Sequence, residues 1–281
     1  MKTYQQLWQS LTPLYEAGEA QAVIRTVLEV RMGLSFTDIV CGKMATLSFG
    51  EWDELEGMAA RLQQGEPVQY VLGEADFADR TFRVGPGVLI PRPETAELCQ
   101  WMVRDAAASP RPPQVLDLCT GSGCIAVTLA LELPQATVTG WDISQDALRM
   151  ATANAERHGM TGRVTIEYGD ALQLSAEPAR WDLIVSNPPY ICEQERGEMA
   201  RNVLDYEPSL ALFVPDDDPL RFYRAIAHYA VESLKPGGAL YFEINPLYAE
   251  EMRQMLSRLP FTEIELREDD YGKQRMMKAT L

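Results

Sequence analysis

The chain has 281 residues, of which 46% are hydrophobic and 23% charged, as expected for a globular protein of one large or two ordinary domains. The formal net charge of −16 either keeps the protein soluble or indicates that free DNA or RNA is not its main substrate. No apolar run approaches the roughly 20 residues of a membrane span, the start lacks a secretory signature, and the five cysteines show neither disulfide nor zinc spacing. We therefore expect a cytoplasmic protein with no membrane partner and no metal.

Apolar residues recur at helical spacing over the first part of the chain. The apolar stripes run through residues 4–14, 22–30, 36–40 and 52–62. Gly33 and Gly65 are placed to end two of these helices. The pattern predicts a small helical domain over residues 1–66 whose side chains form a core and suggest no chemistry.

The spacing of apolar residues falls towards two in the next segment. Residues 68–73 and 75–77 precede the run Thr81–Val84, with turn residues between them. This predicts a β-hairpin linker over residues 67–90.

Two prolines then bracket Arg92, and Glu94 begins a predicted helix that extends through Val103. Arg92 and Glu94 have two interpretations. They form an ordinary surface pair with a carboxylate at a helix start, or they line the mouth of a substrate site.

Strands and helices alternate through the rest of the chain. Strands are predicted at residues 115–119, 137–142, 164–168, 181–185 and 239–243, with a terminal β pair near 264–267 and 276–279. Residues 191–220 are predicted to be largely irregular, and residues 235–238 to form a turn. The alternation predicts an α/β domain over residues 91–281 with a doubly wound, mostly parallel sheet.

Three strand ends carry residue types suited to an adenosine-bearing cofactor. The first strand leads into Asp117, Cys119, Thr120, Gly121, Ser122 and Gly123, the second ends at Asp142, and the third is followed by Asp170. Glycines let the backbone approach a ligand, and a carboxylate about 20 residues on is placed to accept ribose hydroxyls. The third glycine of a dinucleotide fingerprint is absent, which disfavours NAD. The acidic Asp117 suits the cationic groups of S-adenosylmethionine, which we predict as the cofactor.

The fourth strand runs into Ser186-Asn187-Pro188-Pro189-Tyr190 beside that pocket. The two prolines end the strand and stiffen the loop. Asn187 Oδ1 and the Pro188 carbonyl are each able to accept one N–H of a substrate –NH₂ group, which directs the nitrogen lone pair at the methyl donor. Tyr190 is suited to stack on a planar substrate. We predict Asn187, Pro188 and Tyr190 as catalytic, Pro189 as substrate-binding, and Asn187 also beside the cofactor.

The chain resembles the HemK/PrmC family, the release factor glutamine N5-methyltransferases, through nearly all its length. The resemblance is carried by Gly65–Tyr70, Leu89–Thr95, Leu116–Gly123, Ser186–Tyr190, Tyr206–Pro208 with Ala211 and Leu212, and Tyr271–Arg275. It implies a class I S-adenosylmethionine-dependent methyltransferase fold and methylation of the glutamine in the Gly-Gly-Gln loop of bacterial peptide chain release factors. It also implies that the helical domain helps to dock the factor.

The resemblance assigns roles to particular residues. Positions Asn187 and Pro188 take the substrate amide, and Gly121, Asp142 and the Asp170–Ala171 corner hold the cofactor.

Three departures from the family pattern carry expectations. Cys119 stands where the family usually has glycine, so we expect a local adjustment. Ala171 replaces a bulky aromatic of some relatives, which thins the adenine contact. Residues 244–247 replace the usual Ile-Gly, and Pro246 removes a donor.

Three alternatives remain open. A sister activity methylates a glutamine of a ribosomal protein, but the Ile90–Thr95 segment here has the release-factor form. Adenine-N6 methylation of DNA or RNA uses the same kind of loop, and the acidic charge disfavours it. A non-catalytic cofactor-binding protein is kept open by the altered glycine loop.

Overall fold

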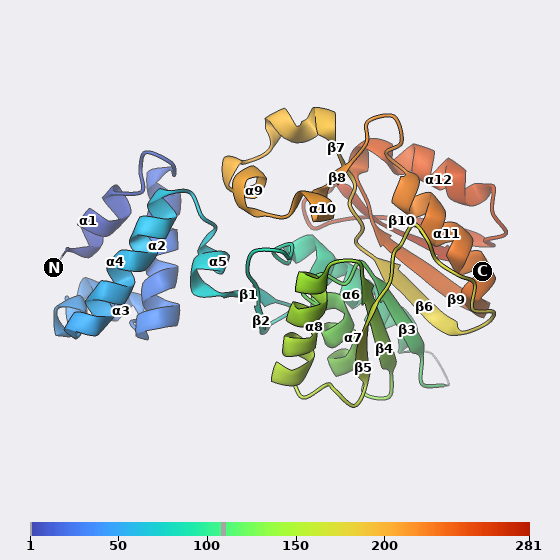
Figure 1. The fold of residues 1–281 in the computed structure, drawn as a ribbon, viewed down its shortest axis with the longest axis horizontal. Coiled ribbons are helices and arrows are strands. Elements are labelled where there is room, and N and C mark those ends of the chain that lie inside the picture. The colour runs from blue at the N-terminus through green and yellow to red at the C-terminus, as the bar shows by residue number, and fades with distance from the viewer. Residues whose placement is uncertain (1, 108–110) are drawn as a thin grey trace. The chain divides into compact units, whose positions relative to one another are not determined.

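The computed structural model describes residues 2–107 and 111–281, which form two compact units (Figure 1). The smaller unit comprises Met1–Glu74 and Ala200–Tyr206, and the larger unit comprises Ala75–Met199 and Glu207–Leu281. Residues 200–206, which the sequence pattern assigned to the sheet domain, thus cluster with the helical unit. Tyr206 contributes a hydrogen bond there, donated by its hydroxyl to the Gln64 carbonyl at 3.0 Å.

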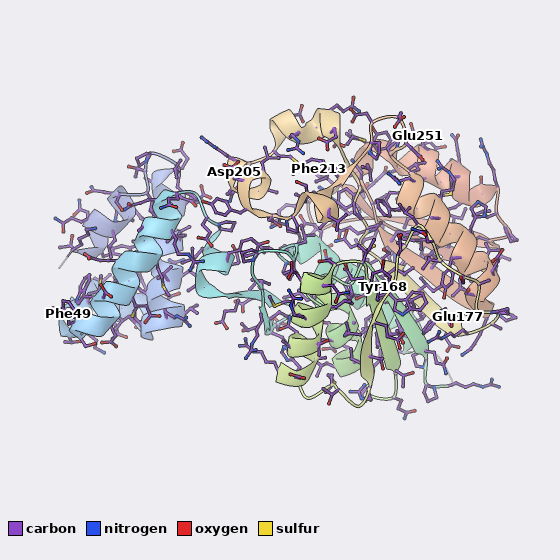
Figure 2. The ribbon with its side chains drawn as sticks, viewed as in Figure 1. Phe49, Tyr168, Glu177, Asp205, Phe213 and Glu251 are labelled. Atoms are coloured by element: carbon purple, nitrogen blue, oxygen red, sulfur yellow. The ribbon has the colours of Figure 1, made fainter. Side chains whose placement is uncertain are left out.

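The smaller unit is helical. Its helices are α1 (Tyr4–Gln9), α2 (Ala17–Met32), α3 (Phe36–Val40), η1 (Lys43–Thr46), α4 (Phe49–Gln63), α5 (Val68–Leu72) and α9 (Arg201–Tyr206). Capping boxes at Thr3, Ser35 and Ser48 satisfy backbone N–H groups where α1, α3 and α4 begin. Leucines and other aliphatic residues of α2 and α4 fill the core. At the surface, Phe49 is 88% exposed at the start of α4 (Figure 2).

The predicted hairpin linker is shorter than expected, because Val68–Leu72 forms the helix α5. Pro67 precedes this helix with φ −55°, and Gly73 ends it in the left-handed conformation. These two caps determine the helical conformation, because the apolar run between them is too short for its spacing to distinguish a helix from a strand. The hairpin proper consists of β1 (Glu74–Phe77) and β2 (Arg80–Arg83).

The larger unit is built on a seven-stranded sheet with the order β10-β11-β9-β6-β3-β4-β5. Its strands are β3 (Gln114–Leu118), β4 (Thr137–Asp142), β5 (Val164–Tyr168), β6 (Trp181–Ser186), β9 (Leu234–Glu243), β10 (Glu263–Glu268) and β11 (Gln274–Thr280). The first five pair in parallel, and β11 joins β9 and β10 in antiparallel fashion. The predicted doubly wound, mostly parallel sheet is confirmed.

Both faces of the sheet are covered by helices. The flanking helices are α6 (Pro93–Ala106), α7 (Cys124–Glu132), α8 (Gln145–Arg157), α11 (Arg221–Ser233) and α12 (Ala249–Ser257). Val115 belongs to the core under α6 and α7, whereas Leu116 and Leu118 belong to the core under α11 and α12, as the alternation of side chains along a strand requires. With both faces buried, the carboxyl ends of the strands are the available place for a ligand.

Two predictions about connecting segments were wrong. Residues 235–238 lie within β9, whose pairing with β6 shifts register between Trp181 and Leu183, so they form an irregularity in a strand and not a turn between elements. The segment 191–220, expected to be largely irregular, holds several short elements. These are β7 (Ile191–Cys192), η2 (Glu193–Glu198), α9, α10 (Ser209–Leu212) and β8 (Phe213–Val214).

Within residues 2–107 and 111–281, every helix is too short or too polar to cross a membrane. The same residues contain no group of three or more His, Cys, Asp or Glu side chains positioned to hold a metal ion.

Candidate functional site

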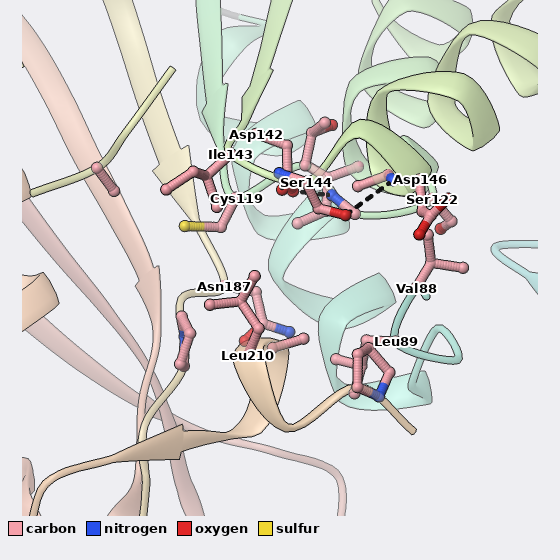
Figure 3. Close-up of a pocket in the computed structure, with 18 of the residues that line it drawn as sticks. Val88, Leu89, Cys119, Ser122, Asp142, Ile143, Ser144, Asp146, Asn187 and Leu210 are labelled. Atoms are coloured by element: carbon pink, nitrogen blue, oxygen red, sulfur yellow. Dashed lines mark hydrogen bonds between the residues drawn. The ribbon is translucent and has the colours of Figure 1, made fainter. Parts of the chain in front are cut away.

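A cavity of about 330 Å³ lies in the larger unit at the carboxyl ends of β3, β4 and β6 (Figure 3). The strands β4 and β5 follow β3 on one side, and the chain then returns to place β6 on the other side of β3. This reversal of strand order is the switch point at which such sheets bind ligands. The residues from the strand ends that line it are Cys119, Thr120, Gly121, Ser122, Asp142, Ile143, Ser144, Asp170, Ala171, Asn187 and Pro189. Most of the predicted site residues are therefore brought together.

The first loop turns sharply at Cys119, which has a φ of +61°. This left-handed conformation is costly for a residue with a side chain, and it explains why a glycine suits the position. The expected local adjustment is therefore a strained backbone conformation at Cys119. The Cys119 side chain lies on the cavity wall (Figure 3). Burial and the nearby Asp142 raise the pKa of the Cys119 thiol, which keeps it protonated.

Asp117 lies behind this loop and not on the cavity wall. It is fully buried, and its Oδ2 accepts hydrogen bonds from Thr120 Oγ1 at 2.6 Å and from the Ala126 N–H at 3.1 Å. Its Oδ1 has no hydrogen-bond partner within the described residues. Burial raises the pKa of this carboxyl to about 7. Asp117 thus fixes the loop to the start of α7, whereas the sequence pattern suggested direct contact with a cationic ligand.

We expect the stability of the protein to depend on Asp117 and pH together. A pKa of about 7 in the folded chain, against a usual value of 3.8, means that the folded state retains a proton that the unfolded chain releases. Stability therefore falls as pH rises through this window, by about 4 kcal/mol at about 1.4 kcal/mol per unit. The Asp117→Asn variant stays uncharged and keeps both accepted hydrogen bonds at its Oδ1. In urea unfolding of the unliganded protein, the free energy of unfolding of the variant minus that of the wild type should increase between pH 4 and pH 8. If the free energies of unfolding of the two proteins changed in parallel with pH, the raised pKa of Asp117 would be contradicted.

Two glycines shape the rest of the loop. Gly123 precedes α7 with φ +77°, and a Cβ there would lie 2.9 Å from the Ala151 Cβ, so glycine permits the close packing of α7 on α8. Gly121 has φ +55° and open space where a Cβ would point. Because Gly121 lines the cavity, its bare backbone forms a cradle for a ligand.

Asp142 is tied to this loop by its carboxylate. Oδ2 accepts from the Gly121 N–H and Oδ1 from the Ser144 N–H, each at 2.9 Å. Burial raises the pKa of Asp142, and these backbone bonds oppose the rise. Each oxygen retains a further lone pair, and Asp142 lines the cavity. A pair of fixed acceptors suits vicinal hydroxyl groups.

Asp170 and Ala171 line the next part of the wall. Asp170 caps its own turn, accepting from the Leu172 N–H at 2.9 Å and from Gln173 Nε2 at 2.7 Å. Ala171 is buried. Its side chain is small, and the weak contact that we expect between Ala171 and an adenine ring remains a prediction.

The Asn187–Tyr190 loop presents its residues unequally. Asn187 lies on the cavity wall (Figure 3) and donates through Nδ2 to Thr95 Oγ1 at 3.2 Å. Both prolines of the loop are buried, and of the two Pro189 lines the cavity. Tyr190 packs partly buried against the core under α11 and donates its hydroxyl to Glu243 Oε1 at 3.0 Å. It is thus placed behind the wall, where the sequence pattern suggested a stacking surface.

The 244–247 segment has its shape set by Asn245. Its Oδ1 accepts from the Leu247 N–H at 3.0 Å, and its Nδ2 donates to the Tyr190 carbonyl at 3.1 Å and to Glu195 Oε1 at 2.9 Å. The loop in which Pro246 removes a donor is therefore held by a side-chain amide that also supports the Asn187–Tyr190 loop.

Arg92 lines the cavity, and Glu94 lies in the first turn of α6. The partner of Arg92 is Glu207, whose Oε1 accepts from Arg92 Nη2 at 2.5 Å while Oε2 accepts from the Ile90 N–H at 3.1 Å. The Glu207 side chain is only 1% exposed. Its two hydrogen bonds hold the 207–211 segment beside the cavity. Of the two predicted mouth residues, the structure places Arg92 at the cavity.

Several lining residues were missed by sequence analysis. They are Gly87, Val88, Leu89, Thr95, Ile143, Leu210 and Phe222. Ile143 had a local signal, since an apolar residue directly follows the acid at the end of a strand and remains 41% exposed. Leu210 and Phe222 come from segments distant along the chain, and no pattern within them indicates a site.

Comparison with known families and proteins agrees with this architecture. A family model described as the methyltransferase small domain matches residues 100–206, and the PrmC N-terminal domain matches residues 7–73. The chain is 46% identical over 272 residues to a release factor glutamine methyltransferase from Bacteroides thetaiotaomicron, covering 96% of each protein. It is 38% identical over 285 residues to one from Flavobacterium psychrophilum, covering 99% of this chain and 98% of the relative.

Among solved structures, a 16S rRNA N2 G1207 methyltransferase from T. thermophilus superposes with a TM-score of 0.53. It is 20% identical, and the match covers 74% of this chain and 49% of that one. At this identity the likeness concerns the fold, which agrees with the sheet described above.

Proposed function

Because the chain belongs to the release factor glutamine methyltransferase family, we propose that it transfers a methyl group from S-adenosylmethionine to the side-chain amide nitrogen (N5) of the glutamine in the Gly-Gly-Gln loop of peptide chain release factors. The observation that carries the proposal is the position of Asn187. It lies on one cavity with Asp142 and Gly121, so an amide-binding group and a nucleoside-binding group share one space.

The residues present fit S-adenosylmethionine. Asp142 offers two fixed acceptors for ribose hydroxyls, and Gly121 leaves the backbone open to the ligand. The cofactor, when bound, supplies a methyl group on a cationic sulfonium. Asp142 and Asp170 place carboxylates around the cavity, which suits a cation, and no phosphate-binding arrangement is required.

The residues of the chain then orient the amide. An amide nitrogen is a weak nucleophile because its lone pair is delocalised. Asn187 Oδ1 and the Pro188 carbonyl accept the two N–H bonds of the glutamine –NH₂ group, which fixes the nitrogen and stabilises the positive charge that develops on it. The methylated amide is a strong acid and releases its extra proton to water, so this route needs no ionised side chain as a base. The raised pKa of Cys119 fits that requirement.

The helical unit provides a surface for a protein substrate. Several large apolar side chains of this unit are exposed, among them Phe36, Val40 and Phe49. We assign residues 1–66 to docking of the release factor, residues 67–90 to a linker, and residues 91–281, apart from the 200–206 segment that clusters with the helical unit, to catalysis. Because release factors act in translation, this proposal also implies that the enzyme works in the cytoplasm.

The proposal is tested by incubating the purified protein with labelled S-adenosylmethionine and three substrates: a release factor, ribosomal proteins and duplex DNA. We expect label on the release factor alone, and no label when its Gly-Gly-Gln glutamine is replaced by alanine. Label on a ribosomal protein or on DNA instead would transfer the assignment to that substrate. Cofactor binding without transfer to any of them would indicate a non-catalytic protein.

A further inference from the structure

A buried chain of hydrogen bonds runs behind Asn187. Asn187 Nδ2 donates to Thr95 Oγ1 at 3.2 Å, and Thr95 Oγ1 donates to Glu243 Oε2 at 2.5 Å. The other oxygen of Glu243 accepts from the Tyr190 hydroxyl at 3.0 Å. Thr95 and Glu243 are 3% and 2% exposed. They come from α6 and β9, so the chain connects three separate segments of the larger unit.

The direction of these bonds follows from the number of protons available. A threonine hydroxyl has one proton and two lone pairs, and the proton of Thr95 is engaged by Glu243. Its oxygen is then able only to accept from Asn187. The Asn187 amide must therefore turn its –NH₂ end to Thr95, which leaves Oδ1 for a group in the cavity. Without this constraint the two ends of an amide are nearly equal in shape.

Both oxygens of Glu243 accept hydrogen bonds from hydroxyl groups, and such bonds favour the ionised carboxylate. The pKa of Tyr190 is raised well above its usual value by burial and by Glu243, so Tyr190 keeps its proton and donates it. Burial also raises the pKa of Glu243, while the Thr95 and Tyr190 hydroxyls and the Arg275 charge oppose this rise. Glu243 is further fixed at its backbone, where its carbonyl accepts from the Tyr223 hydroxyl at 3.1 Å.

We infer that Thr95 and Glu243 are positioning residues that hold the Asn187 amide with Oδ1 facing the cavity. The consequence for methyl transfer rests on the proposed function, because Oδ1 must accept an N–H of the substrate amide. If the Asn187 amide turned over, –NH₂ would face –NH₂ and the substrate nitrogen would lose its acceptor. Thr95 and Glu243 thus act through Asn187 and do not themselves contact the reacting atoms.

The first test uses three threonine variants with the release factor as substrate. Thr95→Val keeps the shape of the side chain and removes both hydrogen bonds, so we expect kcat to fall roughly 10- to 100-fold, with the Kd for S-adenosylmethionine unchanged. Thr95→Ser retains the hydroxyl and should recover most of kcat. Thr128→Val is the matched control, because Thr128 is also buried and its hydroxyl has no hydrogen-bond partner among the described residues. A kcat for Thr95→Val equal to that of Thr128→Val would overturn the inference.

Glu243→Gln tests the direction of the bonds at nearly constant size. A glutamine presents one donor end, which must face either Thr95 or Tyr190. When it faces Thr95, the Thr95 proton is released towards Asn187 and favours the turned-over amide. We expect kcat to fall about tenfold without a matching change in KM. A rise in KM alone would show that Glu243 supports the docking of the substrate and not the orientation of Asn187.

A measurement without substrate separates this inference from the proposed function. In ¹⁵N NMR spectra of the unliganded protein, the Asn187 side-chain –NH₂ resonances should shift, and their solvent exchange should accelerate, in Thr95→Val but not in Thr128→Val. If the wild type methylates no release factor while these changes occur, the proposed function fails and the positioning stands. If transfer occurs and the resonances do not respond to Thr95→Val, the positioning fails.

Discussion

Replacement of Asn187 by alanine is expected to abolish methyl transfer while leaving the binding of S-adenosylmethionine intact. In the proposed mechanism Asn187 provides the acceptor that orients the substrate –NH₂ group, and removal of one such group costs about 10²- to 10³-fold in kcat in comparable sites. The same proposal assigns the cofactor mainly to the loops of Gly121 and Asp142, which bind each other through a 2.9 Å hydrogen bond. Single-turnover transfer of labelled methyl to a release factor measures the first effect, and titration calorimetry measures the second.

The control for this variant is Gln254→Ala, which also removes a side-chain amide. Gln254 lies in α12, outside the residues that line the cavity, and its Nε2 donates to Glu250 Oε1 at 2.9 Å. It should transfer methyl groups at the wild-type rate. Normal turnover by Asn187→Ala would refute the proposed mechanism, and loss of cofactor binding by this variant would assign Asn187 to the cofactor.

Replacement of Asp142 by alanine is expected to weaken cofactor binding roughly 100-fold or more. Each hydrogen bond to a carboxylate is worth about 1.5–3 kcal/mol, and two bonds to the ribose hydroxyls are lost. The variant also leaves the Gly121 and Ser144 N–H groups without their acceptor, which loosens the loop that cradles the ligand. Titration with S-adenosylmethionine and with S-adenosylhomocysteine should show equal losses, because the two ligands share the ribose.

A ligand without ribose hydroxyls distinguishes contact from loop damage. The 2′,3′-dideoxy form of S-adenosylhomocysteine should bind weakly to the wild type, and Asp142→Ala should cost it less affinity than it costs S-adenosylhomocysteine, because only the effect on the loop remains. A further loss of the same size in the variant would mean that Asp142 acts only through the loop. Asp218→Ala serves as a carboxylate control, because Asp218 pairs with Arg224 away from the cavity.

The strand-end residues were predictable because their signals are local. Asp142 and Asn187 each end or follow a hydrophobic run, and parallel strands bring such ends to one edge. The placement of Asp117 was also within reach of sequence analysis. Leu116 and Leu118 face the core under α11 and α12, so Asp117 between them must point to the α7 side, where it caps the Ala126 N–H.

The supporting contacts of the site were not predictable, since their partners lie far apart in the sequence. Thr95 meets Glu243 across 148 positions, and Ile90 meets Glu207 across 117. Taken alone, each of these four residues has the pattern of an ordinary helix, strand or loop residue. The helix α5 was missed for a different reason: five residues are too few to separate a helical from a strand period, and the deciding caps at Pro67 and Gly73 act outside the apolar run.

The discontinuous make-up of the helical unit has a consequence for synthesis of the chain. Because Ala200–Tyr206 belongs to the same unit as Met1–Glu74, that unit is not finished when its first 74 residues have left the ribosome. Domains that are continuous in sequence complete their folding in order of synthesis. The buried core of this unit comes from residues 7–72, so α1 to α5 are able to pack before α9 exists, whereas the bond from Tyr206 to Gln64 forms only after β3 to β6 have been made. The smaller unit is therefore completed while the larger unit is still being synthesised.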